Sequence, residues 1–373
     1  MLQSLEIENF RQFSHFTIPK LGRINLLTGK NNSGKTSVLE AIHLLMTQEH
    51  PAQVMIKLQI SRGEVSPIPD SDQYAAEITH LFCNRQVSEG EVIKISGANE
   101  QAKERRLTIQ IDSNRNPKKS TIIVDDFSKD FYKVNWPKLI LERQNWNSEI
   151  HKYEGIILPD IRIAFNRSAD FQDSFAQDQE SHFLVSTNLN SREVTSLFDE
   201  IVLRPEEDRV IEAIKIIEPN IKRIAPDHTQ VEKVGLSPRQ GFLTQILGGN
   251  GRTPMGSMGD GIWRLLGIVL TMVNAKGKVL LIDEIDTGFH YSVMVDLWKL
   301  IWKTAQELDI QIFATTHSQD CWKSLAGLIY EEGEKATENG GIIIHHIDSS
   351  KDEPTSIFDD EIIDAVKNRI ELR

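Results

Sequence analysis

The order of apolar and polar positions predicts a chain in which strands and helices alternate. A continuous apolar run at residues 24–27 is typical of a buried strand, and apolar positions at helical spacing follow at residues 38–45. The C-terminal half repeats this order, with strand patterns at residues 278–283, 310–315 and 341–347 and helical patterns at residues 262–273, 291–308, 318–328 and 359–370. Alternation of this kind predicts an α/β fold with a parallel sheet.

The region between these two parts has a different pattern. A strand is predicted at residues 2–7, followed by residues 9–13 and a short second strand. Beyond residue 51 we expect a helix at residues 74–82, strands at residues 92–96, 107–112 and 120–124, a turn at residues 114–117, another strand at residues 182–187, and helices at residues 193–202 and 205–217. The pattern therefore indicates a strand-rich insertion before the C-terminal half.

Composition limits the class of protein but does not identify it. The 373 residues are 39% hydrophobic and 26% charged, as in a soluble globular protein, and the net charge of −12 argues against a generally basic protein that coats nucleic acid. The longest apolar run, residues 265–273, is far short of the ~20 residues of a membrane span, and no signal sequence is apparent. Only two cysteines occur. We therefore expect a cytoplasmic protein without a membrane partner.

A phosphate-binding loop lies between the first buried strand and its helix. Residues 29–36 read GKNNSGKT and fit G-x-x-x-x-G-K-[ST] at every required position. Lys35 is expected to reach the β- and γ-phosphates, and the Thr36 hydroxyl to ligate Mg²⁺. The nucleotide-binding residues predicted for this loop and the helical turn after it are Asn31, Asn32, Ser33, Gly34, Lys35, Thr36 and Ser37. The ligands expected from this motif are therefore a polyphosphate and Mg²⁺, and the resemblance given below implies that the polyphosphate is that of ATP.

Two later strands end in residues that suit phosphate chemistry. The apolar run at residues 279–282 ends in Asp283 and Glu284, and the strand at residues 310–315 is followed by His317. In a parallel sheet these ends lie on the same edge as the phosphate loop. We expect Asp283 to hold Mg²⁺, Glu284 to act as the general base for water, and His317 to reach the γ-phosphate.

A Gly-rich loop at residues 254–261, PMGSMGDG, precedes the helix at residues 262–273. Together with the phosphate loop, the acidic pair and the histidine, it resembles the ATP-binding-cassette (ABC) ATPases. The resemblance implies that Ser257 and Gly259 act in trans on nucleotide held by a second copy, and that Asp286 lies at the dimer seam. A homodimer or higher even oligomer follows from it. Met258 and Asp260 stand where that family usually has Gly and Gln.

The branch of this superfamily is indicated by local sequence. Residues 5–13, LEIENFRQF, resemble the start of RecF, SMC and overcoming-lysogenization-defect (OLD) ATPases, in which Arg11 would lie near the nucleotide. Residues 281–291 and 311–318 look like OLD-type ATPases of antiphage systems. Roughly 220 residues separate the phosphate loop from the Gly-rich loop, about twice what a transporter ATPase needs. A transporter subunit is therefore disfavoured.

The resemblance implies one ABC-type ATPase head over residues 1–373: a P-loop NTPase fold with a mixed sheet, a helical lobe and a strand-rich insertion. Its predicted parts are the insertion at residues 50–181, the lobe carrying the Gly-rich loop at residues 188–277, and the C-terminal part of the core at residues 278–373. OLD proteins often add a Toprim nuclease domain, for which too little chain follows His317. A separate effector, a nuclease or toxin, is then the expected partner. Asn188 or Asn190 could stand for the family's Gln-loop residue.

Two other functions remain open. A RecF-like DNA repair ATPase would bind DNA, for which Lys103, Arg105, Arg106, Arg115, Lys118 and Lys119 offer either a basic track or an ordinary solvated face. A nucleotide-gated scaffold would bind ATP and scarcely hydrolyse it. His345 and His346 are adjacent on a predicted strand and face opposite ways, so we do not expect them to chelate a metal.

Overall fold

The computed structural model describes residues 1–47, 51–68, 73–85, 87, 90–112, 138–157, 162–166, 180–185, 191–227, 241–248, 251–333 and 341–368. The chain divides into two compact units. The first unit comprises Met1–Leu21, Asn32–Glu180 and Ile347–Pro354, and the second comprises Gly22–Asn31, Ser181–His346 and Thr355–Arg373. The division falls inside the phosphate loop, so each unit carries part of that loop.

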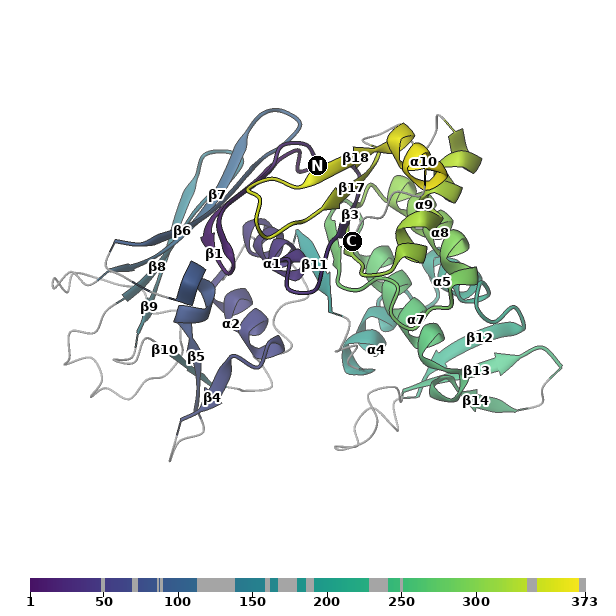
Figure 1. The fold of residues 1–373 in the computed structure, drawn as a ribbon. Coiled ribbons are helices and arrows are strands. Elements are labelled where there is room, and N and C mark those ends of the chain that lie inside the picture. Colours follow the sequence, from purple (N-terminus) through teal and green to yellow (C-terminus); the bar gives the residue numbers. More distant parts are fainter. Residues whose placement is uncertain are drawn as a thin grey trace. The chain divides into compact units, whose positions relative to one another are not determined.

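The first unit is built on a six-stranded antiparallel sheet. Its strands, in spatial order, are β2 (Phe13–Ile18), β1 (Leu5–Phe10), β6 (Val92–Ala98), β7 (Glu104–Asp112), β8 (Lys138–Gln144) and β9 (Ile150–Ile156). Buried and more exposed positions alternate along β6 and β7, as expected when one face of a sheet is covered. Helix α1 (Lys35–Met46) packs against β1, β6 and β7 (Figure 1).

A smaller sheet completes the first unit. Its strands, in spatial order, are β10 (Arg162–Asn166), β5 (Gln73–Glu77) and β4 (Val65–Pro67). Helix α2 (Pro51–Ser61) packs against both α1 and β5, and two short 3₁₀ turns, Ile78–Leu81 and Cys83–Arg85, follow β5. This arrangement brings α2 to the helix that follows the phosphate loop, and the turn after β5 to Arg11, which donates to the His80 carbonyl at 3.1 Å.

The second unit contains a mixed six-stranded sheet. Its strands, in spatial order, are β11 (Ser181–Leu184), β15 (Val279–Ile282), β16 (Gln311–Thr315), β3 (Ile24–Thr28), β17 (Ile342–His346) and β18 (Thr355–Phe358). All neighbours are parallel except β17 and β18. Strands β3, β15 and β16 are buried at every position, which explains their continuous apolar runs.

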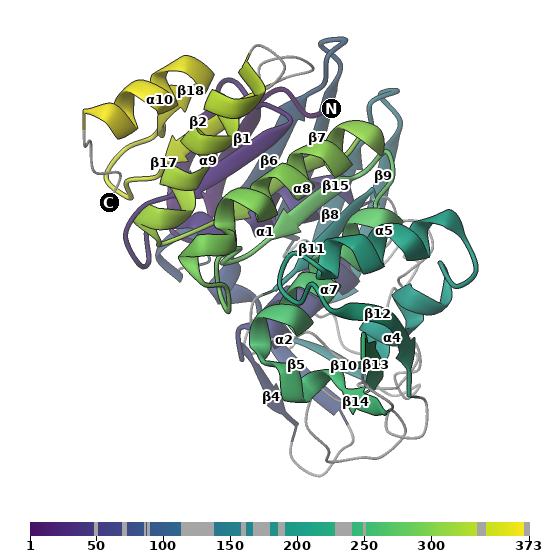
Figure 2. The same ribbon diagram turned by 90° about the vertical axis from the view of Figure 1, so that its right-hand side faces the viewer.

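Helices cover this sheet and extend into a lobe. The helices of the second unit are α4 (Ser191–Asp199), α5 (Pro205–Ile214), α7 (Asp260–Asn274), α8 (Met294–Glu307), α9 (Gln319–Glu332) and α10 (Asp359–Lys367). Helix α7 packs on β11 and β15 and also on α4 and α5, while α9 lies between α8 and α10 (Figure 2). The lobe includes a three-stranded sheet of β12 (Ile221–Pro226), β13 (Phe242–Ile246) and β14 (Arg252–Pro254).

The predicted mixed α/β architecture is confirmed, with one wrong element. The helix expected at residues 74–82 is strand β5 followed by a 3₁₀ turn, because residues 73–77 pair with both β4 and β10. This is tertiary pairing overriding a local pattern. The strand expected at residues 120–124 and its turn lie outside the described residues. Within the part that is described, no helix has the length and apolarity needed to cross a membrane.

Candidate active site

The phosphate loop is shaped by residues with left-handed backbone conformations. Gly29, Asn32 and Gly34 have φ angles of 137°, 61° and 104°. Gly34 has no space for a side chain, because a Cβ there would lie 2.2 Å from Gln12 Nε2 and 2.3 Å from the Phe13 ring. Helix α1 begins directly afterwards, and the main-chain N–H groups of its first turn form the positive end of its dipole. The loop and helix therefore form a local environment suited to an anion.

The side chains of the loop and the first helical turn also suit phosphate. Lys35 and Ser37 are buried, and Thr36 is partly exposed. The Ser33 hydroxyl is buried and has no hydrogen-bond partner among the described residues. A buried donor of this kind is costly unless it is satisfied, and a phosphate oxygen would accept from it. This orphaned hydroxyl supports the assignment of the loop as a polyphosphate cradle.

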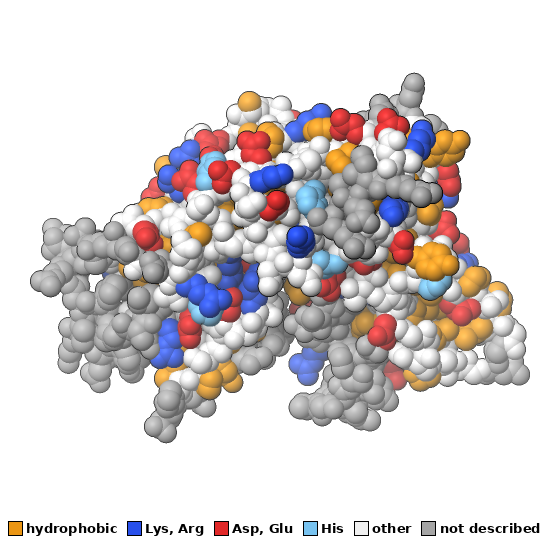
Figure 3. All heavy atoms as spheres, viewed as in Figure 1, with side chains coloured by type: hydrophobic (Ala, Val, Ile, Leu, Met, Phe, Trp, Pro, Cys, Tyr) orange, Lys and Arg blue, Asp and Glu red, His pale blue; other side chains and the backbone are white. Residues whose placement is uncertain are grey.

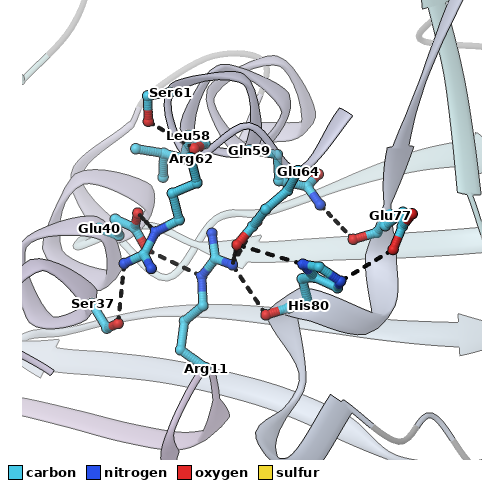
Figure 4. A network of polar contacts seen from close by, with 10 residues as sticks. All are labelled: Arg11, Ser37, Glu40, Leu58, Gln59, Ser61, Arg62, Glu64, Glu77 and His80. Carbon is cyan, nitrogen blue, oxygen red and sulfur yellow. Dashed lines mark hydrogen bonds and ion pairs between the residues drawn. The ribbon is translucent and has the colours of Figure 1, made fainter. Parts of the chain in front are cut away.

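A buried ion-pair network surrounds Arg11 in the first unit (Figure 4). Arg11 Nε donates to Glu40 Oε2 at 3.1 Å, and its Nη1 donates to Glu64 at 2.7 Å. Arg62 Nε donates to the other oxygen of Glu40 at 2.5 Å, and its Nη2 donates to Ser37 Oγ at 3.3 Å. Burial raises the pKa of Glu40 in spite of the two guanidinium groups. The network ties the turn between β1 and β2 to helix α1.

A pocket of about 420 Å³ opens beside this network, and Arg11, Ser37, Arg62 and Arg85 are among its lining residues. Arg11 Nη2 is buried and has no hydrogen-bond partner within the described part of the chain. Arg11 therefore lies near Ser37, in the first turn of the helix that follows the phosphate loop, but its guanidinium group already forms ion pairs with Glu40 and Glu64. Its predicted contact with nucleotide remains a prediction.

The acidic pair forms a constrained turn at the end of β15. Asp283 is 8% exposed, and its Oδ1 accepts a hydrogen bond from Thr315 Oγ1 at 2.6 Å. The Glu284 N–H donates to the same Thr315 oxygen at 2.7 Å. Glu284 has a φ of 50°, a conformation that is uncommon for residues other than Gly, and its carboxylate accepts from Thr287 Oγ1 at 3.2 Å. Neutral hydroxyl groups thus orient both acids.

His317 lies beside the first half of the phosphate loop in the second unit. A pocket of about 440 Å³ is lined by Gly29, Lys30, Asn31 and His317, among others. The neighbouring Thr316 holds the predicted dimer-seam residue, because its hydroxyl donates to Asp286 Oδ1 at 2.6 Å. The second unit therefore brings together the acidic pair, Asp286, His317 and the start of the loop, all at the carboxyl ends of parallel strands.

The Gly-rich loop is solvent-exposed at its predicted functional residues. Ser257 lies in a short 3₁₀ turn, Met255–Met258, and its hydroxyl donates to the Pro254 carbonyl at 2.7 Å. Gly259 has a φ of 101° and immediately precedes α7. A Cβ at Gly261 would lie only 2.7 Å from the Gly288 carbonyl oxygen, so the start of α7 packs closely against the turn after Asp286. The trans roles of Ser257 and Gly259 stay predictions.

Two residues of this site were not singled out from the sequence. Thr315 bridges Asp283 and Glu284, and Arg264 of α7 donates to the main-chain carbonyls of Asp283 at 2.7 Å and Val185 at 3.2 Å. Burial lowers the pKa of Arg264 to about 10, although nearby carboxylates act in the opposite direction. A buried arginine in an otherwise apolar helix is the sequence signal that could have drawn attention to it. The Gln-loop candidates, Asn188 and Asn190, lie outside the described residues.

The candidate basic track is only partly available to a ligand. Arg105 is buried, forms an ion pair with Glu180 and stacks against the Trp146 ring at 4.7 Å, and Arg106 pairs with Glu104. Arg115, Lys118 and Lys119 fall outside the described residues. On the face shown in Figure 3, basic and acidic side chains are interspersed. The described part of the track therefore resembles a solvated face with internal ion pairs.

Comparison with known proteins identifies the family of the chain. A family model described as the AAA ATPase domain matches residues 1–321. The chain belongs to the AAA ATPase domain family. An ATP/GTP phosphatase of Helicobacter pylori is 21% identical over 355 residues, which is 89% of either chain. The DNA replication and repair protein RecF of Idiomarina loihiensis is 48% identical over 44 residues, 12% of either chain.

Membership of this family agrees with the fold. The predicted α/β fold with a mixed sheet and the predicted ATPase class are confirmed. A crystal structure of an SMC head bound to the C-winged helix domain of ScpA is 13% identical, covers 96% of this chain and 97% of its own, and superposes with a TM-score of 0.48.

Proposed function

We propose that the protein binds Mg·ATP, hydrolyses it, and acts as a nucleotide-controlled switch for a partner effector. The observation that carries the ATPase role is the order of strands β15, β16 and β3 in one parallel sheet. Their carboxyl ends carry the acidic pair, His317 and the start of the phosphate loop. Membership of the AAA ATPase domain family supports the same reading.

The residues present suit the two predicted ligands. Asp283 offers a buried carboxylate and Thr36 a hydroxyl, and hard oxygen donors of this kind are what Mg²⁺ prefers. When bound, Mg²⁺ would neutralise charge on the phosphate oxygens. Lys35 and the main-chain N–H groups at the start of α1 would bind the β- and γ-phosphates, joined by the buried Ser33 hydroxyl. Asn31, Asn32 and Ser37 complete the proposed cradle.

The proposed reaction is in-line attack of water on the γ-phosphate. Glu284 would orient the water and accept its proton, because its carboxylate follows the metal-binding residue directly and is held by Thr287. His317 would donate a hydrogen bond to the γ-phosphate from beside Gly29 and Lys30. Catalysis would then rest on positioning and charge stabilisation, as is usual for phosphoryl transfer.

The proposed switch involves two copies of the chain. Exposed Ser257 and Gly259 would cover the γ-phosphate held by a second copy, with Asp286 at the seam. A homodimer around two ATP molecules, or a higher even oligomer, would form with ATP and open after hydrolysis. The sequence resemblance to OLD-type ATPases supports a separate nuclease or toxin as the output, and antiphage defence as the biological role.

Substitution of the proposed base tests the ATPase and the dimer together. Glu284→Gln should retain ATP, lose turnover, and shift the protein to an ATP-dependent dimer in size-exclusion chromatography with light scattering. Glu307→Gln is the matched control, because Glu307 is an exposed acid of α8 paired only with Arg209 at the surface in the contacts described. Turnover by Glu284→Gln equal to that of Glu307→Gln would contradict the assignment.

The existence of a partner effector is tested with Glu284→Gln, the variant expected to remain in the ATP-bound dimer. Tagged Glu284→Gln, expressed with its neighbouring genes and kept in Mg·ATP, should purify with a stoichiometric nuclease-like or toxin-like chain, identified by mass spectrometry. Recovery of the homodimer alone, in repeated preparations that retain ATP, would contradict the effector role while leaving the ATPase assignment intact.

A RecF-like DNA repair ATPase is the second candidate, and the local likeness to RecF favours it. It predicts that duplex DNA stimulates ATP turnover and that this stimulation falls steeply with salt, because phosphate contacts release counterions. Turnover unchanged by DNA at low salt would argue against it. A scaffold that binds ATP and scarcely hydrolyses it would show ATP-dependent dimers of the wild-type chain without product in single-turnover kinetics.

A further inference from the structure

We infer that Arg264 is a positioning residue that sets the plane of the Asp283–Glu284 peptide and thereby aims the Glu284 carboxylate. The inference rests on the proposed role of Glu284 as general base and assigns to a residue of α7 the task of holding it. Arg264 touches neither carboxylate in the contacts described. It acts on the backbone between them.

The peptide between the two acids is held at both of its polar atoms. Its carbonyl oxygen, from Asp283, accepts a hydrogen bond from Arg264 Nη2 at 2.7 Å. Its N–H, from Glu284, donates to Thr315 Oγ1 at 2.7 Å. Because a peptide unit is planar, fixing these two atoms fixes the orientation of the whole unit. The direction in which the Glu284 side chain leaves the backbone follows from that orientation.

The conformation held in this way is one the backbone would not adopt readily. Glu284 has a φ of 50°, which is disfavoured for a residue with a Cβ and persists when surrounding contacts hold it. Arg264 is 4% exposed and remains charged at neutral pH, because its pKa is lowered only to about 10. A charged donor makes a stronger hydrogen bond to a carbonyl than a neutral one. Without Arg264, the turn can relax to a more common geometry.

The same side chain connects three parts of the second unit. Its Nη1 donates to the Val185 carbonyl just after β11, and Arg264 itself lies one helical turn into α7. Helix α7 starts at Asp260, directly after Gly259 of the exposed Gly-rich loop. A shift of this loop would move the start of α7 and, through Arg264, the Asp283–Glu284 peptide. Binding of a second copy at the Gly-rich loop would in this way change the orientation of Glu284 without contacting it.

The test compares Arg264 with a second buried arginine of the same unit. Arg23 is 6% exposed, and its Nη1 donates to the carbonyls of Ala305 and Ile310, both at 3.2 Å. Arg264→Met should lower kcat for ATP on the order of 10–100-fold with KM unchanged, as expected when a group that orients a catalytic residue is lost. Arg264→Lys should recover part of that loss. Arg23→Met should leave both constants near wild type.

A double mutant shows whether Arg264 acts through Glu284. In the Glu284→Gln background, Arg264→Met should cause no further loss of turnover, whereas independent roles would give losses that multiply. Multiplying losses would overturn the inference. Equal losses of kcat in Arg264→Met and Arg23→Met would do so as well.

A readout without ATP separates this inference from the proposed function. Hydrogen exchange of the Glu284 amide should be faster in Arg264→Met than in wild type and unchanged in Arg23→Met, because only the former loosens the peptide that this amide belongs to. Unchanged exchange in Arg264→Met would overturn the positioning role even if the protein is an active ATPase. Faster exchange in a chain that lacks ATP turnover would refute the proposed function and retain the structural part of the inference.

Discussion

Two buried polar sites, Glu40 in the first unit and His345 in the second, are stabilised by different means. In the first unit the Glu40 side chain is 1% exposed and lies between the guanidinium groups of Arg11 and Arg62, so its charge is compensated by opposite charges. In the second unit His345 is completely buried, and its ring contacts the neutral Ser356 hydroxyl at 2.9 Å and an asparagine side chain. The Glu40 site therefore holds charge inside the protein, whereas the His345 site excludes it.

The difference determines how each region responds to change. Removing Glu40 takes one opposite charge from each of two guanidinium groups, so the penalty is large, although Arg11 keeps its ion pair with Glu64. A neutral hydrogen bond can be removed at the cost of one contact. The cluster supports helix α1, which carries Lys35, whereas neutral hydroxyls hold the acidic turn at Asp283. A buried network of charges therefore stabilises helix α1, whereas single hydrogen bonds from a neutral hydroxyl hold the acidic turn.

The largest effect is expected at Glu40. Glu40→Ala leaves Arg11 and Arg62 without their shared carboxylate, and breaking a buried pair in this way costs about 3–5 kcal/mol. Chemical denaturation at neutral pH should show this loss. Glu307→Ala, which removes an acid from an exposed pair with Arg209, should cost less than about 1 kcal/mol. Similar costs for the two substitutions would mean that the buried cluster stabilises the protein no more than a surface ion pair does.

A smaller effect on stability is expected when the pH is lowered, because the buried His345 is neutral in the folded protein. Burial lowers the pKa of His345 to about 3, well below its usual value near 6.5. Between these two values the unfolded chain binds a proton that the folded protein does not. The contribution of His345 to stability is therefore complete above pH 6.5 and falls as the pH is lowered, by about 2 kcal/mol between pH 7 and pH 5.

The histidine's contribution is isolated by comparing wild type with His345→Gln. Glutamine cannot titrate, so the stability difference between the two proteins should shrink or reverse by the same amount on acidification. Denaturation midpoints at pH 7, 6 and 5 would measure it. A difference that stays constant over this range would mean that His345 takes up its proton in the folded protein and that the second unit tolerates the charge.

The sequence predicts those parts of the site whose residues are close together in the chain. The phosphate loop, the acidic pair and His317 each follow a short apolar run, and β3, β15 and β16 occur where those runs predict them. A continuous apolar run carries this information because both faces of a central parallel strand are covered. Motif and strand are then adjacent in the chain, and no tertiary contact is needed to recognise them.

Contacts between distant segments could not be predicted in this way. Glu64 meets Arg11 from 53 positions away, and Thr315 meets Asp283 from 32 positions away. Helix α2 is not among the predicted elements, and the helix predicted over β5 is wrong because one of the two strands that pair with β5, namely β10, is remote in sequence. Arg264 belongs to the same class, since a helix pattern does not say which carbonyls a buried guanidinium will meet.

The smallest effect on stability, and the sharpest comparison with Glu40, is expected at Thr315. Thr315→Val keeps the shape of the side chain but removes the hydroxyl that donates to Asp283 and accepts from the Glu284 N–H. Glu284 is partly exposed, so solvent can replace the bond from its N–H, whereas Asp283 is buried and loses one neutral donor; the cost of losing a single hydroxyl should be about 1 kcal/mol. ATP turnover should fall much more than stability, since two restraints on the acidic turn are lost together.

Thr271→Val is the control for this change. Thr271 is a buried threonine of the same unit whose hydroxyl donates to the Gly267 carbonyl within α7 at 2.7 Å, away from the acids. Its substitution should affect stability no more than Thr315→Val and should leave turnover intact. If Thr315→Val lowers the free energy of unfolding as much as Glu40→Ala does in the same denaturation experiment, the Thr315 hydroxyl is as important for the stability of the fold as the buried charge of Glu40. A modest loss of stability in Thr315→Val together with low ATP turnover would mean that the hydroxyl orients Asp283 and Glu284 without being needed for the fold.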